Sequence, residues 1–113
     1  MHSIWDGLIT ENSKYRENRN TVIQLMSAPE HAADKFSSEV AVLGVQDWII
    51  ESHALAREKA YTFNGKLLNG GTSKQSAELL PDGYFAAVEP VAKRRGVLAG
   101  YRMAAVLKEA LGN

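Results

Sequence analysis

His2 and Asp6 stand four residues apart near the start of the sequence, and together they offer a ring nitrogen and a carboxylate oxygen. In a helix, residues four apart project from the same face, so these two side chains would converge on one point. Zinc accepts both kinds of ligand, but a catalytic zinc normally takes three protein ligands and keeps one position open. The pair therefore predicts part of a zinc site, or else a chance spacing in which both residues only decorate a helix.

Three further residues are candidates for supporting such a site. Trp5 adjoins Asp6, and Glu51 and Ser52 follow Trp48 on a predicted helix. Polar groups on a buried helix face need hydrogen-bond partners, so Glu51 and Ser52 are expected either to orient metal ligands or to bond to helix ends. Trp48 itself is expected in the core. No residue of this chain is assigned a catalytic role.

Two other polar groups carry a weaker signal. His31 and Asp34 are three residues apart, but no third ligand is near them in the sequence, so we expect an exposed pair at the start of a helix. Lys93-Arg94-Arg95 and Arg102 form the only basic cluster. Surfaces that bind single-stranded nucleic acid interleave aromatic and basic residues, and only Tyr101 is close. We therefore expect these basic side chains to be solvated helix surface.

Helices must position these residues, because apolar side chains recur at steps of three and four along most of the chain. Pro29 suits the first turn of a helix, and Asp82 is a good residue to cap one. The polar stretch Tyr15–Asn20 is expected to be a solvated face or a loop. The predicted helices are approximately His2–Thr10, Thr21–Ser27, Glu30–Phe36, Glu39–Tyr61, Ser73–Leu79 and Gly83–Leu111.

Two long helices carry the predicted core, and together they make the expected fold an all-α helical bundle with a single domain over residues 1–113. Pro90 should kink the last helix, because proline removes one backbone hydrogen bond. Two Asn-Gly steps within Phe63–Gly71 end the preceding helix, and we expect a loop there rather than a hairpin. The predicted buried stripes are Val42, Val45, Ile49, Ser52, Leu55, Ala56 and Ala60 in one helix, and Phe85, Val88, Ala92, Gly96, Ala99, Met103, Val106 and Ala110 in the other.

Composition restricts the function classes. The 113 residues carry 13 basic and 13 acidic side chains, so the formal net charge is zero and no general attraction to nucleic acid or to an anionic membrane is expected. There is no cysteine, which excludes disulfides and thiolate metal sites. No apolar run approaches the roughly 20 residues needed to span a bilayer, and no signal peptide is visible at Met1.

Several stretches, in the same order and spacing, resemble the zinc-dependent single-strand nucleases of the S1/P1 family, in the phospholipase C/nuclease superfamily. Met1-His2-Ser3-Ile4-Trp5-Asp6 resembles the family's late zinc-ligand motif, hydrophobe-His-Ser-x-Trp-Asp. Trp48-Ile49-Ile50-Glu51-Ser52 is similar to its Trp-x-x-Glu-Ser helix. The resemblance extends to about Leu111 and covers the second half of a family member. Its remaining matches are Gly83-Tyr84, Pro90, Arg95 and Leu98-Ala99-Gly100-Tyr101-Arg102-Met103-Ala104.

The resemblance implies a fold and a chemistry. The chain would be the C-terminal half of a larger, mainly α-helical nuclease that binds three zinc ions, cleaves single-stranded DNA or RNA and removes the phosphate of 3'-nucleotides. His2 and Asp6 would share one zinc with an upstream histidine, so this chain would hold at most one partial site and would be inactive alone. A complementary N-terminal half is the implied partner, and secretion or periplasmic export is the implied location.

Two alternatives remain open at this stage. The chain could be a non-catalytic helical interaction module, in which His2 and Asp6 hold no metal. It could also be the naturally separate subunit of a split enzyme, docking on a catalytic half. An exposed apolar face on the helices would favour a partner of some kind.

Overall fold

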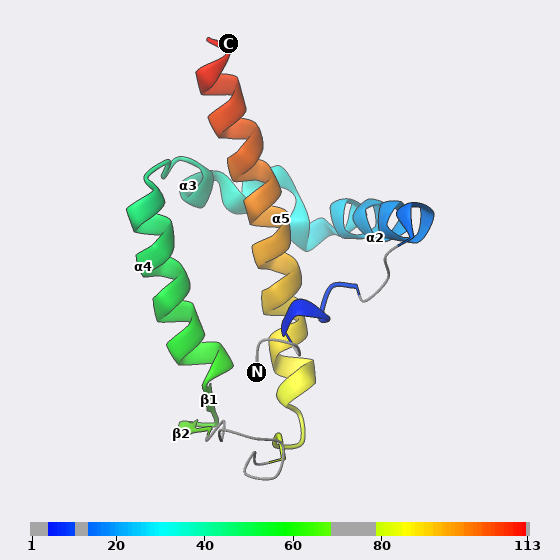
Figure 1. The fold of residues 1–113 in the computed structure, drawn as a ribbon, viewed down its shortest axis with the longest axis vertical. Coiled ribbons are helices and arrows are strands. Elements are labelled where there is room, and N and C mark those ends of the chain that lie inside the picture. Colours follow the sequence, from blue (N-terminus) through cyan, green and yellow to red (C-terminus); the bar gives the residue numbers. More distant parts are fainter. Residues whose placement is uncertain (1–4, 11–13, 69–78, 113) are drawn as a thin grey trace.

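The computed structural model describes residues 5–10, 14–68 and 79–112, and the helical fold class is confirmed. Helix α5 (Tyr84–Ala110) runs along most of the molecule, with α4 (Val45–Leu55) beside it and α2 (Tyr15–Ser27) on its other side (Figure 1). The 3₁₀ turns η1 (Pro29–His31) and η2 (Ala33–Phe36) and the short helix α3 (Ser37–Val40) connect α2 to α4.

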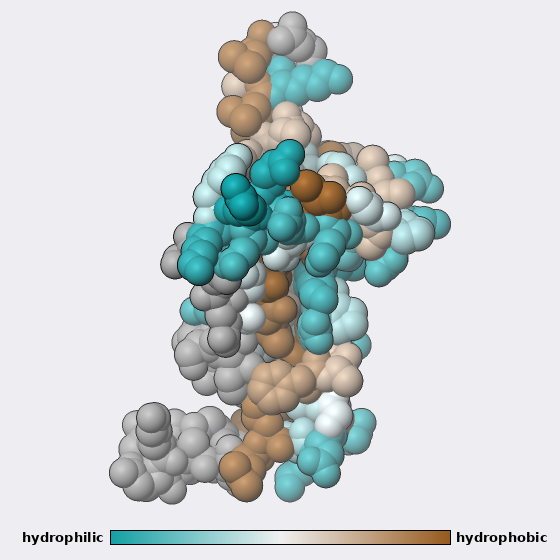
Figure 2. All heavy atoms as spheres, turned by 90° about the vertical axis from the view of Figure 1, so that its right-hand side faces the viewer, coloured by the Kyte–Doolittle hydropathy of each residue, from teal (hydrophilic) through white to brown (hydrophobic). Residues whose placement is uncertain are grey.

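Helix α5 begins after Gly83, whose φ of 84° is a left-handed conformation that glycine adopts without strain. The helix continues through Pro90, which has no N–H to donate, and a kink there stays a prediction. The C-terminal end of α5 projects beyond the rest of the molecule, apolar on one side and charged on the other (Figure 2).

The buried face of α5 differs from the predicted stripe. Val88 and Ala92 are buried as expected, but Phe85 is 53% exposed and Met103 is 65% exposed. The reason is that α5 is apolar on more than one side, so its periodicity alone could not select the face that the neighbouring helices cover. The residues of α5 that are buried are Tyr84, Val88, Ala92, Val97, Leu98 and Arg102.

The core lies where α2, η2 and α3 meet the middle of α5. Phe36, Val97 and Leu98 are buried there, and Leu25 and Tyr101 pack against them. The Phe36 and Tyr101 rings are 5.3 Å apart between centroids. The core therefore depends on α5 and on the turns before α4, with little contribution from α4 itself.

Tyr15–Asn20 is a largely exposed part of helix α2, so of the two expectations the solvated face holds and the loop does not, because this stretch has no glycine or proline and its Arg and Glu residues are good helix formers. Two other predictions for the first half of the chain are wrong. The predicted helix Glu39–Tyr61 is interrupted between α3 and α4, where Gly44 has an extended conformation. The Trp48 indole N–H donates to Val42 O across this break at 2.7 Å.

His31 is the second error, because its side chain was expected to be exposed but is buried, with only 5% of the residue's surface exposed. Its Nδ1 lies 2.7 Å from Leu25 O, and because a carbonyl only accepts, Nδ1 carries the proton. The Tyr101 hydroxyl donates to His31 O at 3.0 Å. His31 therefore ties the turn after α2 to both α2 and α5, and it does not form a surface pair with Asp34.

The region after α4 also differs from the expectation. The helix passes into a π-helical turn, η3 (Ala56–Ala60), and then into the strands β1 (Thr62–Phe63) and β2 (Lys66–Leu67). The strands pair in an antiparallel hairpin, with Thr62 opposite Leu67. Asn64 and Gly65 both have positive φ, which is what a two-residue hairpin turn requires, so the loop expected here was wrong. Of the predicted helix Ser73–Leu79, all but Leu79 lies outside the described residues.

Candidate functional site

The Trp5–Asp6 segment is fixed to the rest of the fold by one tyrosine. The Trp5 indole N–H donates to the Tyr84 hydroxyl at 3.0 Å, and that hydroxyl donates to Ala60 O at 2.7 Å. Tyr84 is fully buried and lies at the first turn of α5. The start of the chain, the π turn and α5 are thus held together, and the backbone beside Asp6 has a defined place.

Asp6 itself is exposed to solvent, while its neighbour Trp5 is half-buried. Only residues 5 and 6 of this segment are described as helical, and Gly7–Ile9 form a turn, so the predicted helix His2–Thr10 ends earlier than expected. His2 lies outside the described residues. Whether its imidazole meets the Asp6 carboxylate therefore stays a prediction.

A cavity of about 380 Å³ opens beside Asp6 between the start of the chain, α4 and α5. Its walls are mostly apolar, with Ser52 and Arg95 as polar groups across from Asp6. Ser52 therefore shares a cavity with Asp6, whereas Glu51 lines a separate, charged cleft with Glu39 and Arg94. The lining residues are Trp5, Asp6, Ile9, Ser52, Leu55, Ala56, Ala60, Tyr61, Ala92 and Arg95.

The side chains near Asp6 that could bind a metal decide whether an ion fits in this cavity. Among the described residues, no group of three histidine, cysteine or acidic side chains is close enough to hold one ion. Asp6 offers a single exposed carboxylate, which suits zinc or another divalent cation as one ligand but cannot hold it alone. The described residues therefore fit one member of a ligand set and not a complete site.

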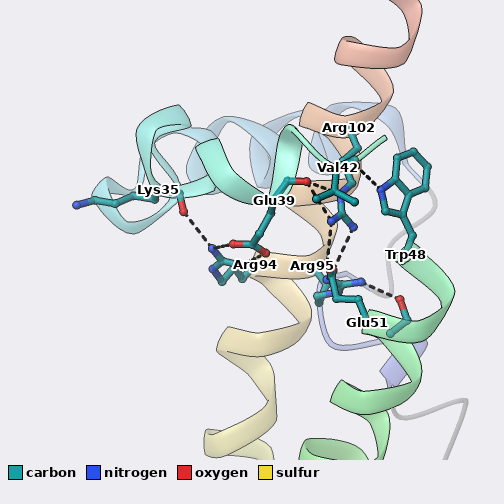
Figure 3. A network of polar contacts seen from close by, with 9 residues as sticks. Lys35, Glu39, Val42, Trp48, Glu51, Arg94, Arg95 and Arg102 are labelled. Atoms are coloured by element: carbon teal, nitrogen blue, oxygen red, sulfur yellow. Dashed lines mark hydrogen bonds and ion pairs between the residues drawn. The ribbon is translucent and has the colours of Figure 1, made fainter. Parts of the chain in front are cut away.

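A network of charged side chains joins α3, α4 and α5 next to this cavity (Figure 3). Arg102 is only 4% exposed, and its Nη2 donates to Glu51 Oε2 at 2.8 Å. Arg95 donates to Glu51 Oε1 and, at 2.8 Å, to Ser52 Oγ. One carboxylate of α4 thus accepts from two guanidinium groups of α5, spaced seven residues or two helical turns apart.

Arginines of α5 also fix α3 in place through hydrogen bonds. Arg94 donates to the Glu39 carboxylate at 2.8 Å and to Lys35 O at 3.1 Å, and its guanidinium lies 4.4 Å from the centre of the Phe36 ring. Arg102 donates to Glu39 O at 3.1 Å as well. A buried charge is tolerated when it is paired and hydrogen-bonded, and the buried Arg102 meets that condition, while Arg94 is half-buried.

The acidic partners in this network are held ionised. Hydrogen bonding from Arg102, reinforced by Arg95, lowers the pKa of Glu51 to about 2, against an opposing contribution from burial. The hydrogen bond from Arg94 likewise holds the pKa of Glu39 below its ordinary value. Neither carboxylate is therefore suited to carry a proton in a reaction near neutral pH.

The arginine contacts correct the expectation of a solvated basic surface. Arg94, Arg95 and Arg102 are engaged with α3 and α4, while Lys93 pairs with Glu89 on the surface at 2.7 Å. The sequence did contain a signal, since Arg95 and Arg102 are seven residues apart and Glu51 is the acidic residue of a predicted buried helix face. Trp48 is half-buried beneath Arg102, with 5.2 Å between the guanidinium and the ring centre.

Comparison with known proteins settles the family. The sequence profile described as S1/P1 nuclease matches residues 1–112, nearly the whole chain. The chain belongs to the S1/P1 nuclease family. No curated protein and no solved structure matches it. The resemblance read from the short motifs is thereby confirmed at the level of the family.

Membership of the S1/P1 nuclease family assigns the chain to a general functional class. Its family consists of hydrolases that act on nucleic acid, and these are generally zinc-dependent and typically secreted. Within the part of the chain that the structure describes, no helix is both long and apolar enough to cross a membrane.

Proposed function

We propose that this chain supplies the C-terminal part of a zinc-dependent endonuclease that hydrolyses phosphodiester bonds of single-stranded DNA and RNA and also acts as a 3'-nucleotidase. The observation that carries the proposal is the family match over residues 1–112, with the His-Ser-x-Trp-Asp motif at its start. The exposed Asp6 carboxylate, beside a tryptophan anchored to α5, supports it.

In this proposal Asp6 and His2 would hold one zinc together with an upstream histidine. A zinc ion held there would supply a bound water of lowered pKa and would offset negative charge on phosphate oxygens. The chain's own contribution is positional. Tyr84 fixes Trp5, and therefore the backbone of Asp6, against α5, while Arg95 holds Ser52 on the opposite wall of the cavity.

Trp5 and Ser52 act around this ligand pair rather than on substrate, and Glu51 does not. Trp5 sets the place of Asp6 through its bond to Tyr84, and Ser52 lines the same cavity. Glu51 turns away into the arginine network and fixes α4 to α5. The partner is an N-terminal part that carries the other zinc ligands, and the complete protein is proposed to be secreted or periplasmic.

The test compares this chain with the complete nuclease, meaning the chain together with the upstream part that the proposal requires. The complete protein should cleave single-stranded DNA faster than duplex DNA, lose activity with a chelator and regain it with zinc. This chain alone should bind at most one zinc, weakly, and cleave nothing. Robust cleavage by the chain alone would contradict the proposal, as would chelator-resistant cleavage by the complete protein.

A non-catalytic helical module, or the docking subunit of a split enzyme, is the second candidate. The observation that favours a partner-binding role is the set of exposed apolar residues on α4, where Val45, Ile49 and Ile50 are each more than 60% exposed. A zinc-edge anomalous signal at Asp6 in crystals of the complete protein would decide for the nuclease. A metal-free Asp6 there, with no cleavage, would decide for the module.

A further inference from the structure

Helix α2 contributes little to the core, yet it is held at both ends. It has no buried residue, and it extends away from α5 (Figure 1). Near its start, the Thr10 hydroxyl donates to the side-chain oxygen of Asn18 at 3.3 Å. Near its end, Leu25 packs against the core, and the carbonyl oxygen of Leu25 accepts from His31. These contacts fix the place of α2, but they do not explain the side chains that it exposes to solvent.

The first half of α2 places an exposed aromatic ring beside two arginines. Tyr15 and Arg19 are four residues apart, and Arg16 and Arg19 are three apart, so these residues share one side of the helix. Tyr15 is 82% exposed, and both arginines are exposed as well. Glu17 is two residues from Tyr15 and two from Arg19, so it belongs to another side. We call Tyr15, Arg16 and Arg19 together the Tyr15–Arg19 face.

The arginines of this face differ from those of α5 in their pairing. Arg94, Arg95 and Arg102 are each paired with a carboxylate of this chain. Among the described residues, neither Arg16 nor Arg19 has such a partner. The whole chain has a formal net charge of zero, so an attraction for a polyanion has to come from a local group of charges such as this one.

The chemistry of the Tyr15–Arg19 face fits single-stranded nucleic acid. An exposed aromatic ring stacks on an unpaired base, and guanidinium groups bind phosphate oxygens. A duplex offers Tyr15 no such base, because its bases are stacked on one another. The second half of α2 exposes the apolar side chains of Val22, Ile23 and Met26 instead, so the combination of ring and charge is confined to the first half. Where α2 comes nearest to the viewer in Figure 2, the surface is mainly hydrophilic.

The face lies within reach of a strand that is bound at Asp6. Thr10 follows Asp6 by four residues, so at most about 14 Å of chain separates the two. Thr10 is hydrogen-bonded to Asn18, which is the residue before Arg19. One short strand can therefore contact both the Asp6 edge and the Tyr15–Arg19 face.

We propose that the Tyr15–Arg19 face is a second contact surface for single-stranded nucleic acid, in which Tyr15 stacks on a base while Arg16 and Arg19 bind phosphates. The choice of ligand rests on the proposed function, because the substrate of a nuclease is a nucleic acid. The face holds a strand beyond the metal site, so it favours polynucleotides over 3'-nucleotides, which are too short to reach both places.

The test measures binding in the absence of cleavage. The chain is titrated, with a chelator present, into a fluorescently labelled oligothymidine of about 12 nucleotides, and fluorescence anisotropy gives the Kd at several salt concentrations. Tyr15→Leu removes the aromatic ring, and Tyr15→Phe keeps it. Arg16→Gln with Arg19→Gln removes the two charges of the face. Arg57→Gln with Lys66→Gln is the matched control, because it removes two exposed charges on η3 and β2.

The proposal predicts a separate effect for the ring and for the charges. Tyr15→Leu should weaken binding about tenfold, whereas Tyr15→Phe should change it less than twofold, because stacking needs the ring and not the hydroxyl. The double variant of Arg16 and Arg19 should weaken binding at low salt. It should also lower the slope of log Kd against log salt by about 1.4, because each phosphate contact to a single strand contributes about 0.7. The control double variant should keep the slope of the unsubstituted chain.

Four results would overturn the proposal. The chain could fail to bind the oligonucleotide, or Tyr15→Leu could bind it as tightly as the unsubstituted chain does. Equal losses in the two double variants would show that the attraction is general. Equal affinity for a duplex of the same length would exclude base stacking. Displacement by an acidic peptide of equal charge, with no effect of Tyr15→Leu, would assign the face to an acidic protein partner instead.

Cleavage by the complete nuclease separates these outcomes from the proposed function. In that protein Tyr15→Leu should raise KM for an oligonucleotide severalfold and leave KM for a 3'-nucleotide unchanged. Oligonucleotide binding that depends on Tyr15, without zinc-dependent cleavage by the complete protein, would refute the nuclease and leave the face standing. Zinc-dependent cleavage with an unchanged KM for the oligonucleotide in Tyr15→Leu would do the reverse.

Discussion

Two regions of this molecule, both built on α5, differ in how complete they are. At the junction of α3, α4 and α5, each of Arg94, Arg95 and Arg102 is paired with an acidic side chain of this chain. At the edge that carries Asp6, the carboxylate is exposed and the adjoining cavity is mostly apolar and open. The contrast teaches that the junction holds this chain's own helices together, whereas the Asp6 carboxylate is left free of such pairing and is the group to which our proposal assigns a metal.

The largest expected effect comes from removing Glu51 from the junction of α3, α4 and α5. Glu51→Ala should lower the free energy of unfolding by about 2–3 kcal/mol, because it leaves the buried Arg102 charge without its partner. This loss is smaller than that expected for a fully buried ion pair, because the Glu51 side chain is partly solvated. Urea denaturation followed by circular dichroism measures it. Glu58→Ala is the control, since Glu58 pairs only with Lys59 on the surface, and it should cost less than about 0.5 kcal/mol.

A smaller loss is expected where the two regions meet. Tyr84→Phe removes the hydroxyl that accepts from Trp5 and donates to Ala60 O, which should cost about 1–2 kcal/mol. It should also release the Trp5 indole, so zinc affinity at Asp6 in the complete protein should fall. Tyr61→Phe is the matched exposed control. Unchanged stability and unchanged zinc affinity in Tyr84→Phe would show that this tyrosine does not anchor the site.

Acid should remove the stability that the junction of α3, α4 and α5 contributes, and it should do so at an unusually low pH. The folded-state pKa of Glu51 is depressed to about 2 and that of Glu39 is also lowered, so their contribution to stability is fully present above the ordinary value near 4.5. It is lost as the pH falls from there toward 2. Unfolding free energies between pH 6 and 2 should decline more steeply in the native chain than in Glu51→Gln. Identical slopes would refute the role of this carboxylate.

The smallest expected effect concerns the two glycines of α5 near the Asp6 edge, Gly96 and Gly100. Gly100→Ala should stabilise the chain alone by about 0.5–1 kcal/mol, because alanine favours the helix and nothing lies within 4 Å of the added atom. Gly96→Ala is the comparison, since Ile9 must shift to admit the methyl group, and it should gain less or lose stability. Thermal unfolding of both variants measures the difference. Equal gains would mean that Ile9 does not pack on α5 as described.

The sequence allowed much of the fold to be predicted, and its failures have physical causes. The long final helix, the burial of Val88 and the family motif at Asp6 could all be recognised from residue pattern. The burial of Arg102 could not, because periodicity marks a polar residue as exposed and says nothing about a carboxylate on another helix. The exposed face of α4 was predicted to be buried for a related reason, since an apolar stripe does not say which partner covers it.

For the metal site, the sequence predicted more than the described part of the structure contains. His2 and Asp6 were predicted from their spacing and from the family motif, and the structure places Asp6 in solvent beside an anchored tryptophan. Among the described residues, Asp6 has no group of further ligands close enough to complete a site. His2, the other predicted ligand, lies outside the described residues, so its contact with Asp6 stays a prediction.

The zinc content of the complete nuclease tests the central claim most directly. Metal analysis of the purified protein should show that Asp6→Ala contains one zinc fewer than the unsubstituted protein, with helical content unchanged. Asp34→Ala, which removes an exposed acidic side chain on η2, should retain the full number. A full complement of zinc in Asp6→Ala would contradict the account, because Asp6 would then hold no metal.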